Sequence, residues 1–257
     1  EVGANNNNNQ MRYVDVDNDA STWNSSSADL TFSSENGALT SCTNIVFAGL
    51  YWTGKSAADN TTNSSNDFSV TKMINGQSIT KNFCKRKILL KGPNSNTYSE
   101  IIANENAIYY PNSSDAFIYS AYTEVTDYVR QHGVGTYFAA DMALTEGNGG
   151  GTGYSGGWGL VVIYENEQMK HRDISLFDGH AFVLNSNTIG YNLEISGFHT
   201  VQTGNVGVKL GLMASEGDAG LPGDYFQIQK NSDLSFMNLQ HQQNAVDNFF
   251  NSSINNS

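Results

Sequence analysis

The residues with the clearest potential for chemistry are three aspartates that alternate along one short segment, Asp15, Asp17 and Asp19. In an extended strand every second side chain lies on the same face, so three unneutralised carboxylates would repel one another there. Carboxylate oxygens are ligands that Ca²⁺ prefers, and the spacing therefore predicts a calcium site. The segment is not an EF-hand, because Ala20 stands where the turn glycine belongs and Ser26 where the bidentate glutamate would be. Solvent exposure or a nearby lysine would relieve the same repulsion, so a solvated acidic strand stays open as the alternative.

A second acidic segment contains Glu216, Asp218 and Asp224, separated by glycines that let backbone carbonyls converge. This loop is another candidate Ca²⁺ site, and an ordinary turn between strands is the alternative. Zinc is not expected, because neither the Cys-x-x-Cys nor the His-Glu-x-x-His spacing occurs. Calcium is therefore the one cofactor that the sequence suggests.

Two aromatic residues, Trp23 and Tyr154, lie in predicted loops and are candidates for ligand contact. A ring on an exposed loop offers a large contact area at a low cost in conformational entropy, so it can stack on a sugar or anchor a partner. Tyr51, Trp52 and Trp158 lie within apolar runs, and we expect these three residues to belong to the core.

Residues 151–157 match two functional patterns, the G-x-G-x-x-G dinucleotide motif and the G-x-S-x-G nucleophile elbow around Ser155. Both motifs need a turn that leads from a strand into a helix, whereas this glycine-rich loop precedes a strand-like run. The five histidines are scattered, and none can be assigned to a triad with Ser155. We therefore predict no catalytic residues and a chain that is not an enzyme.

The charge balance limits the classes of partner. The chain has 25 Asp plus Glu against 13 Lys plus Arg, a net charge of −12. Nucleic acid is not an expected partner, because no basic stripe is present that could displace counterions from phosphates. The one basic cluster, Lys85-Arg86-Lys87, is predicted to be a solvated strand edge. No apolar run approaches the roughly 20 residues that span a bilayer, so we expect no membrane insertion.

Short apolar runs separated by Gly, Asn and Ser clusters recur along the chain and predict an all-β fold. The expected strands lie near 11–17, 28–33, 44–53, 68–74, 86–91, 99–104, 116–121, 136–143, 157–165, 172–177, 180–184, 189–196, 205–214 and 224–229. One window, 123–132, has apolar residues at helical spacing, with Thr123 as a candidate N-cap and Gly133 as a stop. The predicted fold is a jelly-roll-like antiparallel β-sandwich with one short helix. We expect a single domain over 1–257, with low-complexity Asn-rich tails at 1–10 and 251–257.

The only two cysteines, Cys42 and Cys84, leave the redox state open. In an oxidising compartment a disulfide between them would close a loop of about 40 residues. Two separate buried thiols are the alternative, and sequence spacing does not decide between them.

The chain contains, in this order, the blocks Met11–Leu30, Ile45–Trp52, Asp127–Val129, Gly135–Tyr137, Gly156–Glu165, Arg172–Gly179, Ala214–Asp218 and Asn248–Ser252. Together these blocks resemble the N-terminal region of very large surface proteins of Bacteroidota that the type IX secretion system exports. Some of those proteins are gliding-motility or cell-surface adhesins. The resemblance implies a secreted, extracellular, β-rich module at the cell surface, and it supplies no catalytic residues.

These observations lead us to expect a non-catalytic structural and binding module of a bacterial cell-surface adhesin or filament. Its expected partner is a glycan or a protein on a surface. Two alternatives remain. One is a carbohydrate-binding or glycan-active module, which as an enzyme would need two carboxylates facing each other across a cleft. The other is a self-assembling filament subunit that adds a strand to a neighbouring subunit.

Overall fold

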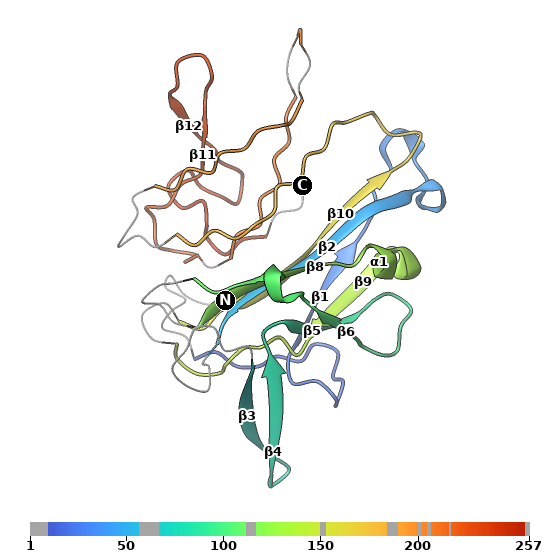
Figure 1. Ribbon diagram of the computed structural model, residues 1–257, viewed down its shortest axis with the longest axis vertical. Coiled ribbons are helices and arrows are strands. Elements are labelled where there is room, and N and C mark those ends of the chain that lie inside the picture. Colours follow the sequence, from blue (N-terminus) through green and yellow to red (C-terminus); the bar gives the residue numbers. More distant parts are fainter. Residues whose placement is uncertain are drawn as a thin grey trace.

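The computed structural model describes residues 10–56, 67–111, 117–149, 153–183, 190–199, 202–204, 207–215 and 217–254. Two four-stranded antiparallel sheets pack face to face (Figure 1). The first contains, in spatial order, β1 (Ser25–Leu30), β9 (Gly135–Ala140), β5 (Lys87–Lys91) and β6 (Ser99–Ile102). The second contains β10 (Gly156–Glu165), β2 (Asn44–Lys55), β8 (Ile118–Glu124) and β7 (Ile108–Tyr109). The prediction of an all-β sandwich is confirmed, while the assignment of 1–257 to one domain stays a prediction.

The core lies between the two sheets and follows the alternation of their strands. From β2, Leu50 and Trp52 are buried, and they meet Leu90 of β5 and Tyr137 of β9. Trp52 lies opposite Trp158 in the ladder that joins β2 to β10. The buried indole N–H of Trp52 donates to the carbonyl oxygen of Lys85 at 2.9 Å, so it keeps a hydrogen bond inside the core.

The predicted helix is present but begins later than expected. It is α1 (Thr126–His132), and Gly133 ends it with a φ of 69°. Thr123 is not the N-cap, because β8 continues to Glu124. The Thr126 hydroxyl accepts a hydrogen bond from the Ala48 backbone N–H at 3.0 Å, which ties the start of α1 to β2. Three 3₁₀ turns complete the helical structure of the described residues: η2 (Glu35–Gly37), η3 (Thr40–Cys42) and η4 (Glu105–Ala107).

A long hairpin of β3 (Asp67–Ile74) and β4 (Gln77–Cys84) projects from the sandwich (Figure 1). Its tip, Asn75-Gly76, has positive φ at both residues (50° and 78°), the conformation that lets a two-residue turn follow the twist of the strands. At its base Phe68 and Phe83 are buried, with ring centroids 5.8 Å apart, and they join the hairpin to the core.

The described residues between 171 and 254 are organised differently and lie over the sheet that contains β2 and β10 (Figure 1). Their only strands among the described residues are β11 (Gln227–Gln229) and β12 (Phe236–Asn238), which pair with each other. The strand predictions at 172–177, 180–184, 189–196 and 205–214 are wrong for the described residues, and so is the one at 11–17, where only Met11 forms an isolated bridge, with Gly147. Alternation decides which face a side chain would occupy, but a strand also needs a neighbouring backbone to complete its ladder.

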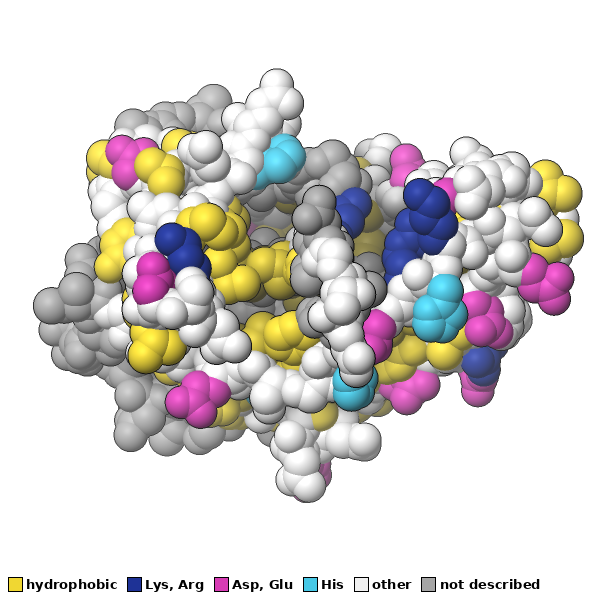
Figure 2. Space-filling view, turned by 90° about the horizontal axis from the view of Figure 1, so that it is seen from above, with side chains coloured by type: hydrophobic (Ala, Val, Ile, Leu, Met, Phe, Trp, Pro, Cys, Tyr) yellow, Lys and Arg dark blue, Asp and Glu magenta, His cyan; other side chains and the backbone are white. Residues whose placement is uncertain are grey.

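Many apolar side chains of this region are exposed as a result, among them Leu193, Val208, Leu210 and Leu212. From above the molecule, hydrophobic side chains gather in a hollowed part of the surface (Figure 2). The last described residues fold back on the same region, because the Ser252 hydroxyl donates to the Gly217 carbonyl. Residues 1–9 and 255–257 of the predicted tails lie outside the described residues.

The described residues also show the state of the two cysteines and whether any helix could span a membrane. Both cysteines are free thiols, Cys42 exposed in η3 and Cys84 half-buried at the end of β4. Among the described residues, no helix has the length and apolar character needed to cross a bilayer.

Candidate functional site

A cluster of polar and aromatic groups lies on the outer face of the second sheet. Tyr51 of β2 pairs in register with Tyr122 of β8, and their rings are 4.8 Å apart. Tyr109 of β7 pairs with Ser120 of β8. We call these four side chains, together with Asp178 and His180, the tyrosine face.

Residues 178–180 bring two more functional groups to the tyrosine face. The His180 ring stacks on Tyr109, with centroids 5.5 Å apart and planes at 14°. Its Nδ1 lies 2.5 Å from the Ser120 hydroxyl oxygen. The Tyr51 hydroxyl donates to Asp178 Oδ2 at 3.5 Å. Strands from the first half of the chain and a segment from its last third therefore build one site.

The electrostatics of the tyrosine face favour the neutral forms of Tyr51, Tyr122 and His180. Burial raises the pKa of Tyr51 and of Tyr122, and the Asp178 carboxylate raises both further, so both phenols remain donors. Burial lowers the pKa of His180 although Asp178 acts in the opposite direction. The imidazole is therefore mainly uncharged at neutral pH, because its ordinary pKa is already about 6.5.

A neutral imidazole beside a serine hydroxyl is also the geometry of a nucleophile and its general base. In a catalytic triad, a carboxylate would orient the imidazole by accepting its second N–H. Asp178 instead accepts from the phenol of Tyr51, so its described hydrogen bond orients a ring of the binding surface. The arrangement presents rings, hydroxyls, an imidazole and a carboxylate side by side, which are the groups that bind polar ligands with apolar faces.

Sequence reasoning missed this site. It assigned Tyr51 and Trp52 together to the core, yet adjacent residues of a strand point to opposite faces. One of the two therefore had to leave the core, and this was the available signal. The approach of His180 to Ser120 joins residues 60 positions apart and has no local signature.

The acidic segment predicted to bind calcium is held by the protein's own groups. Asp15, Asp17 and Asp19 are half-buried while the residues between them are exposed, but the segment is not a strand, and Asn18 between Asp17 and Asp19 has a positive φ of 53°. The Ser25 hydroxyl oxygen lies 2.8 Å from Asp15 Oδ1 and 2.9 Å from Asp17 Oδ1. Asp19 Oδ1 accepts from the backbone N–H of Ser21 at 2.9 Å and closes a turn.

Asp17 is the most strongly held of the three aspartates. Its Oδ2 forms an ion pair with the Lys91 ammonium group and accepts from the Tyr98 hydroxyl, which lies 2.8 Å away. Burial alone would raise the pKa of Asp17, but the hydrogen bonds from Lys91, Tyr98 and Ser25 outweigh it and hold the pKa well below its usual range. A lysine neutralises this carboxylate, which is one of the ways of relieving the repulsion that the sequence left open.

In the second acidic loop, Asp224 Oδ1 accepts from the backbone N–H of Phe250 at 2.7 Å and Asp218 is half-buried, while Glu216 lies outside the described residues. In the part of the chain that the structure describes, no three His, Cys, Asp or Glu side chains are grouped so as to hold a metal ion. Calcium binding stays a prediction for both segments.

The two aromatic residues predicted to contact a ligand have different surroundings. Trp23 packs on Phe83, with centroids 6.0 Å apart, and the ammonium groups of Lys72 and Lys81 lie 5.6 and 5.7 Å from its ring. Cation–π contacts of this kind fasten Trp23 to the β3–β4 hairpin. Tyr154 is half-buried in the loop before β10. Their roles in ligand contact stay predictions.

The prediction that Lys85-Arg86-Lys87 forms a solvated strand edge is wrong for Lys85. Lys85 is fully buried, and its ammonium group has no hydrogen-bond partner among the described residues. It lies 5.6 Å from the ring centroid of Tyr110 and 5.8 Å from that of Tyr119. Burial lowers the pKa of Lys85 to about 8. Lys85 follows β4 directly, at the turn toward β5, and its side chain is buried there.

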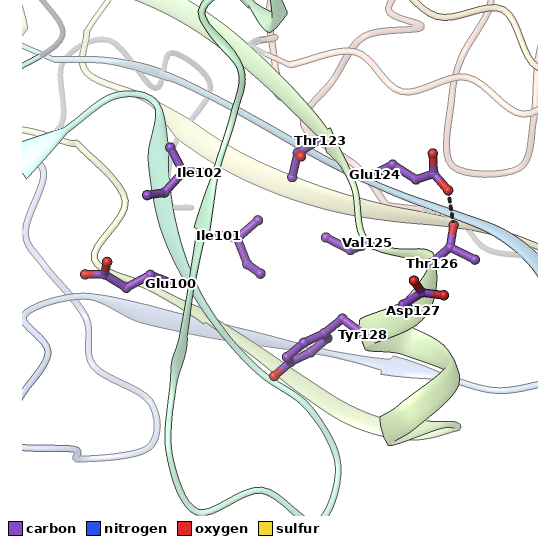
Figure 3. A pocket seen from close by; sticks show the side chains of 9 residues that line it. All are labelled: Glu100, Ile101, Ile102, Thr123, Glu124, Val125, Thr126, Asp127 and Tyr128. Carbon is purple, nitrogen blue, oxygen red and sulfur yellow. Dashed lines mark hydrogen bonds between the residues drawn. The ribbon is translucent and has the colours of Figure 1, made fainter.

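A shallow groove of about 430 Å³ opens between β6 and the junction of β8 with α1 (Figure 3). Ile101 and Val125 point toward each other across it, whereas Glu100 and Glu124 point away on opposite sides. Tyr128 lies at one end, and its hydroxyl donates to the Leu90 carbonyl at 2.9 Å.

Comparisons of this chain with protein-family models, with curated proteins and with solved structures find no match.

Proposed function

We propose that this chain is a non-catalytic structural and binding module of a secreted bacterial cell-surface protein. The resemblance to exported surface proteins of Bacteroidota supplies the location. The tyrosine face is the observation that supports a binding role, since it places three aromatic rings beside a hydroxyl, an imidazole and a carboxylate. The three strands beneath it belong to one sheet, which keeps these groups in fixed relative positions.

The chemistry of the tyrosine face favours a carbohydrate as the ligand. Sugar rings offer C–H faces that pack on aromatic rings and hydroxyls that exchange hydrogen bonds with Ser, His and Asp side chains. Such a site would give the module its adhesive contact.

Affinity electrophoresis through gels that contain individual bacterial and algal polysaccharides tests this proposal. We expect retardation in at least one gel, and loss of that retardation in Tyr109→Ala. Tyr191→Ala is the matched control, because Tyr191 is an exposed tyrosine on the segment 190–199 and not in the tyrosine face. Equal retardation of the two variants would contradict the assignment of the tyrosine face as the contact surface.

The non-catalytic part of the proposal has its own test, because Ser120 and His180 form a nucleophile–base contact. With p-nitrophenyl acetate as a reactive ester, we expect the same rate of hydrolysis for the wild type and for Ser120→Ala. A rate that drops about a hundredfold or more in Ser120→Ala would instead identify an acyl-transfer site.

Self-assembly is a second candidate function, and the uncovered apolar residues of 207–213 favour it. Val208, Leu210 and Leu212 alternate and are exposed, a pattern that a strand supplied by a neighbouring copy would cover. Sedimentation velocity over a range of protein concentrations would then show association, and changing the three residues to Asn would abolish it. A wild type that stays monomeric at every concentration would exclude this candidate.

A further inference from the structure

The groove of Figure 3 has an apolar floor at the margin of the sandwich. Ile101 of β6 and Val125 at the start of α1 face each other inside it. Ile102, which also lines the groove, is 54% exposed. Val125 is itself a core residue and only 5% exposed, so an apolar ligand group placed there would cover mainly Ile101 and Ile102.

The strand β6 gives the groove a second property. It is the last strand of its sheet, and within the described residues it pairs with β5 alone. Alternate residues of an edge strand direct their backbone N–H and C=O groups away from the partner strand. An extended peptide can therefore add to β6 through backbone hydrogen bonds, and its alternate side chains would then enter the groove.

The charges around the groove indicate which side chains the peptide carries at the positions that do not enter the groove. Glu100 is paired with Lys87 at 2.8 Å, and Asp127 with Arg130 at 3.1 Å. Glu124 differs, because its described partner is the neutral hydroxyl of Thr126 at 2.7 Å. The rim is thus negative by one carboxylate, on a chain whose net charge is −12.

We propose that this groove binds an extended peptide segment in which apolar residues alternate with Lys or Arg, added as a strand to β6. The apolar side chains contact Ile101, and the cationic side chains lie near Glu100 and Glu124. This protein-binding site goes beyond the proposed function, because it is separate from the tyrosine face. On β8 the groove is lined by Thr123 and Glu124, whereas the tyrosine face uses residues earlier in the same strand.

Fluorescence anisotropy with a labelled synthetic peptide of alternating valine and lysine tests the proposal on the full chain. We expect saturable binding that weakens about tenfold in Glu124→Gln and more in Glu100→Gln/Glu124→Gln. The matched control is Glu167→Gln, which removes the same charge from an exposed residue after β10 and should leave the affinity unchanged. These positions are exposed, so the variants keep the fold, and circular dichroism verifies it.

Two further peptides separate strand addition from simple charge attraction. A peptide with glycine in place of valine keeps the charge but loses the apolar side chains, and we expect it to bind at least about tenfold more weakly. A peptide N-methylated at alternate residues loses the N–H groups of one edge, and we expect no binding. Equal binding by either peptide, or by Glu167→Gln and Glu124→Gln, would overturn the proposal. Loss of polysaccharide binding in Tyr109→Ala would not affect these outcomes.

Discussion

The sandwich and the C-terminal region, residues 171–254, have similar apolar patterns but different packing. In the sandwich, apolar residues at alternate positions such as Leu50 and Trp52 are buried between two sheets. In the C-terminal region, Leu210 and Leu212 have the same spacing and remain exposed. Alternation of apolar residues therefore indicates only that a segment could form a half-buried strand. Whether the strand forms depends on a partner backbone.

The largest expected contrast concerns aspartates that hold backbone segments in the two regions. Asp17→Asn leaves the Lys91 ammonium group unpaired in a site where the Asp17 side chain is only 7% exposed, and we expect a loss of about 3–5 kcal/mol. Asp224→Asn weakens one hydrogen bond to the half-buried backbone N–H of Phe250 and should cost about 1 kcal/mol. Urea unfolding of both variants measures the contrast. Equal losses would mean that both regions are equally integrated.

The pH dependence of the stability difference between wild type and Asp17→Asn tests whether the Asp17 carboxylate causes it. Because the folded pKa of Asp17 lies below its unfolded value, its contribution is complete above about pH 4 and decreases as the pH falls toward the folded pKa. The difference in unfolding free energy between wild type and Asp17→Asn should therefore shrink below pH 4. A difference that stays constant down to pH 2.5 would contradict the ion pair as its origin.

Matched leucine substitutions compare the packing of the two regions directly. Leu90 is fully buried, so Leu90→Ala should cost about 2–5 kcal/mol through lost burial and the cavity left behind. Leu210 is 47% exposed, and Leu210→Ala should change the stability by less than about 0.5 kcal/mol. Thermal unfolding followed by circular dichroism is sufficient. A large cost at Leu210 would show that the C-terminal region has a core of its own.

Lys85 allows a test inside the sandwich that has no counterpart in the other region. Its folded pKa of about 8 lies below the ordinary lysine value of about 10.4, so the unfolded chain binds more protons between these values, and stability rises as the pH increases through that range. We expect Lys85→Met to be more stable than wild type at pH 7 by about 2–3 kcal/mol, and the difference to decline toward pH 10. Lys87→Met, at a half-exposed lysine, is the control. A difference that does not depend on pH would exclude the buried ammonium group as its cause.

The smallest expected effect is that of calcium on the acidic segment. Since Lys91 already neutralises Asp17, adding about 1 mM Ca²⁺ after EGTA should raise the melting temperature by less than about 1 °C. A rise of several degrees that disappears in Asp17→Ala would instead support the calcium site predicted from Asp15, Asp17 and Asp19.

The predictions from sequence were correct for elements that have a clear local pattern. The runs that became β2 and β10 show alternation and length, and α1 has apolar residues at helical spacing followed by Gly133. The sequence could not indicate that Lys91 would meet Asp17, because the two residues lie 74 positions apart and each alone is consistent with a solvated surface. Lys85 was assigned to the surface for the same reason, since its burial depends on neighbours such as Tyr110 and Tyr119 that are distant in sequence.

The candidate site was less predictable than the fold. The tyrosine face depends on the register of three strands and on the position of residues 178–180, and neither is encoded by a local motif. The sequence motifs that match known patterns surround Ser155. The cluster that the fold assembles contains a different serine, Ser120, beside His180. Single-sequence motifs and assembled sites therefore pointed to different serines.

Because of where its tryptophans lie, the intrinsic fluorescence of this protein can distinguish unfolding of the sandwich from unfolding of the C-terminal region. The chain has three tryptophans, Trp23, Trp52 and Trp158, and all of them lie in the sandwich. Their emission therefore reports the solvation of the sandwich and is silent about residues 171–254. Far-ultraviolet circular dichroism sums over the whole backbone, so a transition that it shows and that tryptophan fluorescence lacks during the same denaturation would belong to the C-terminal region.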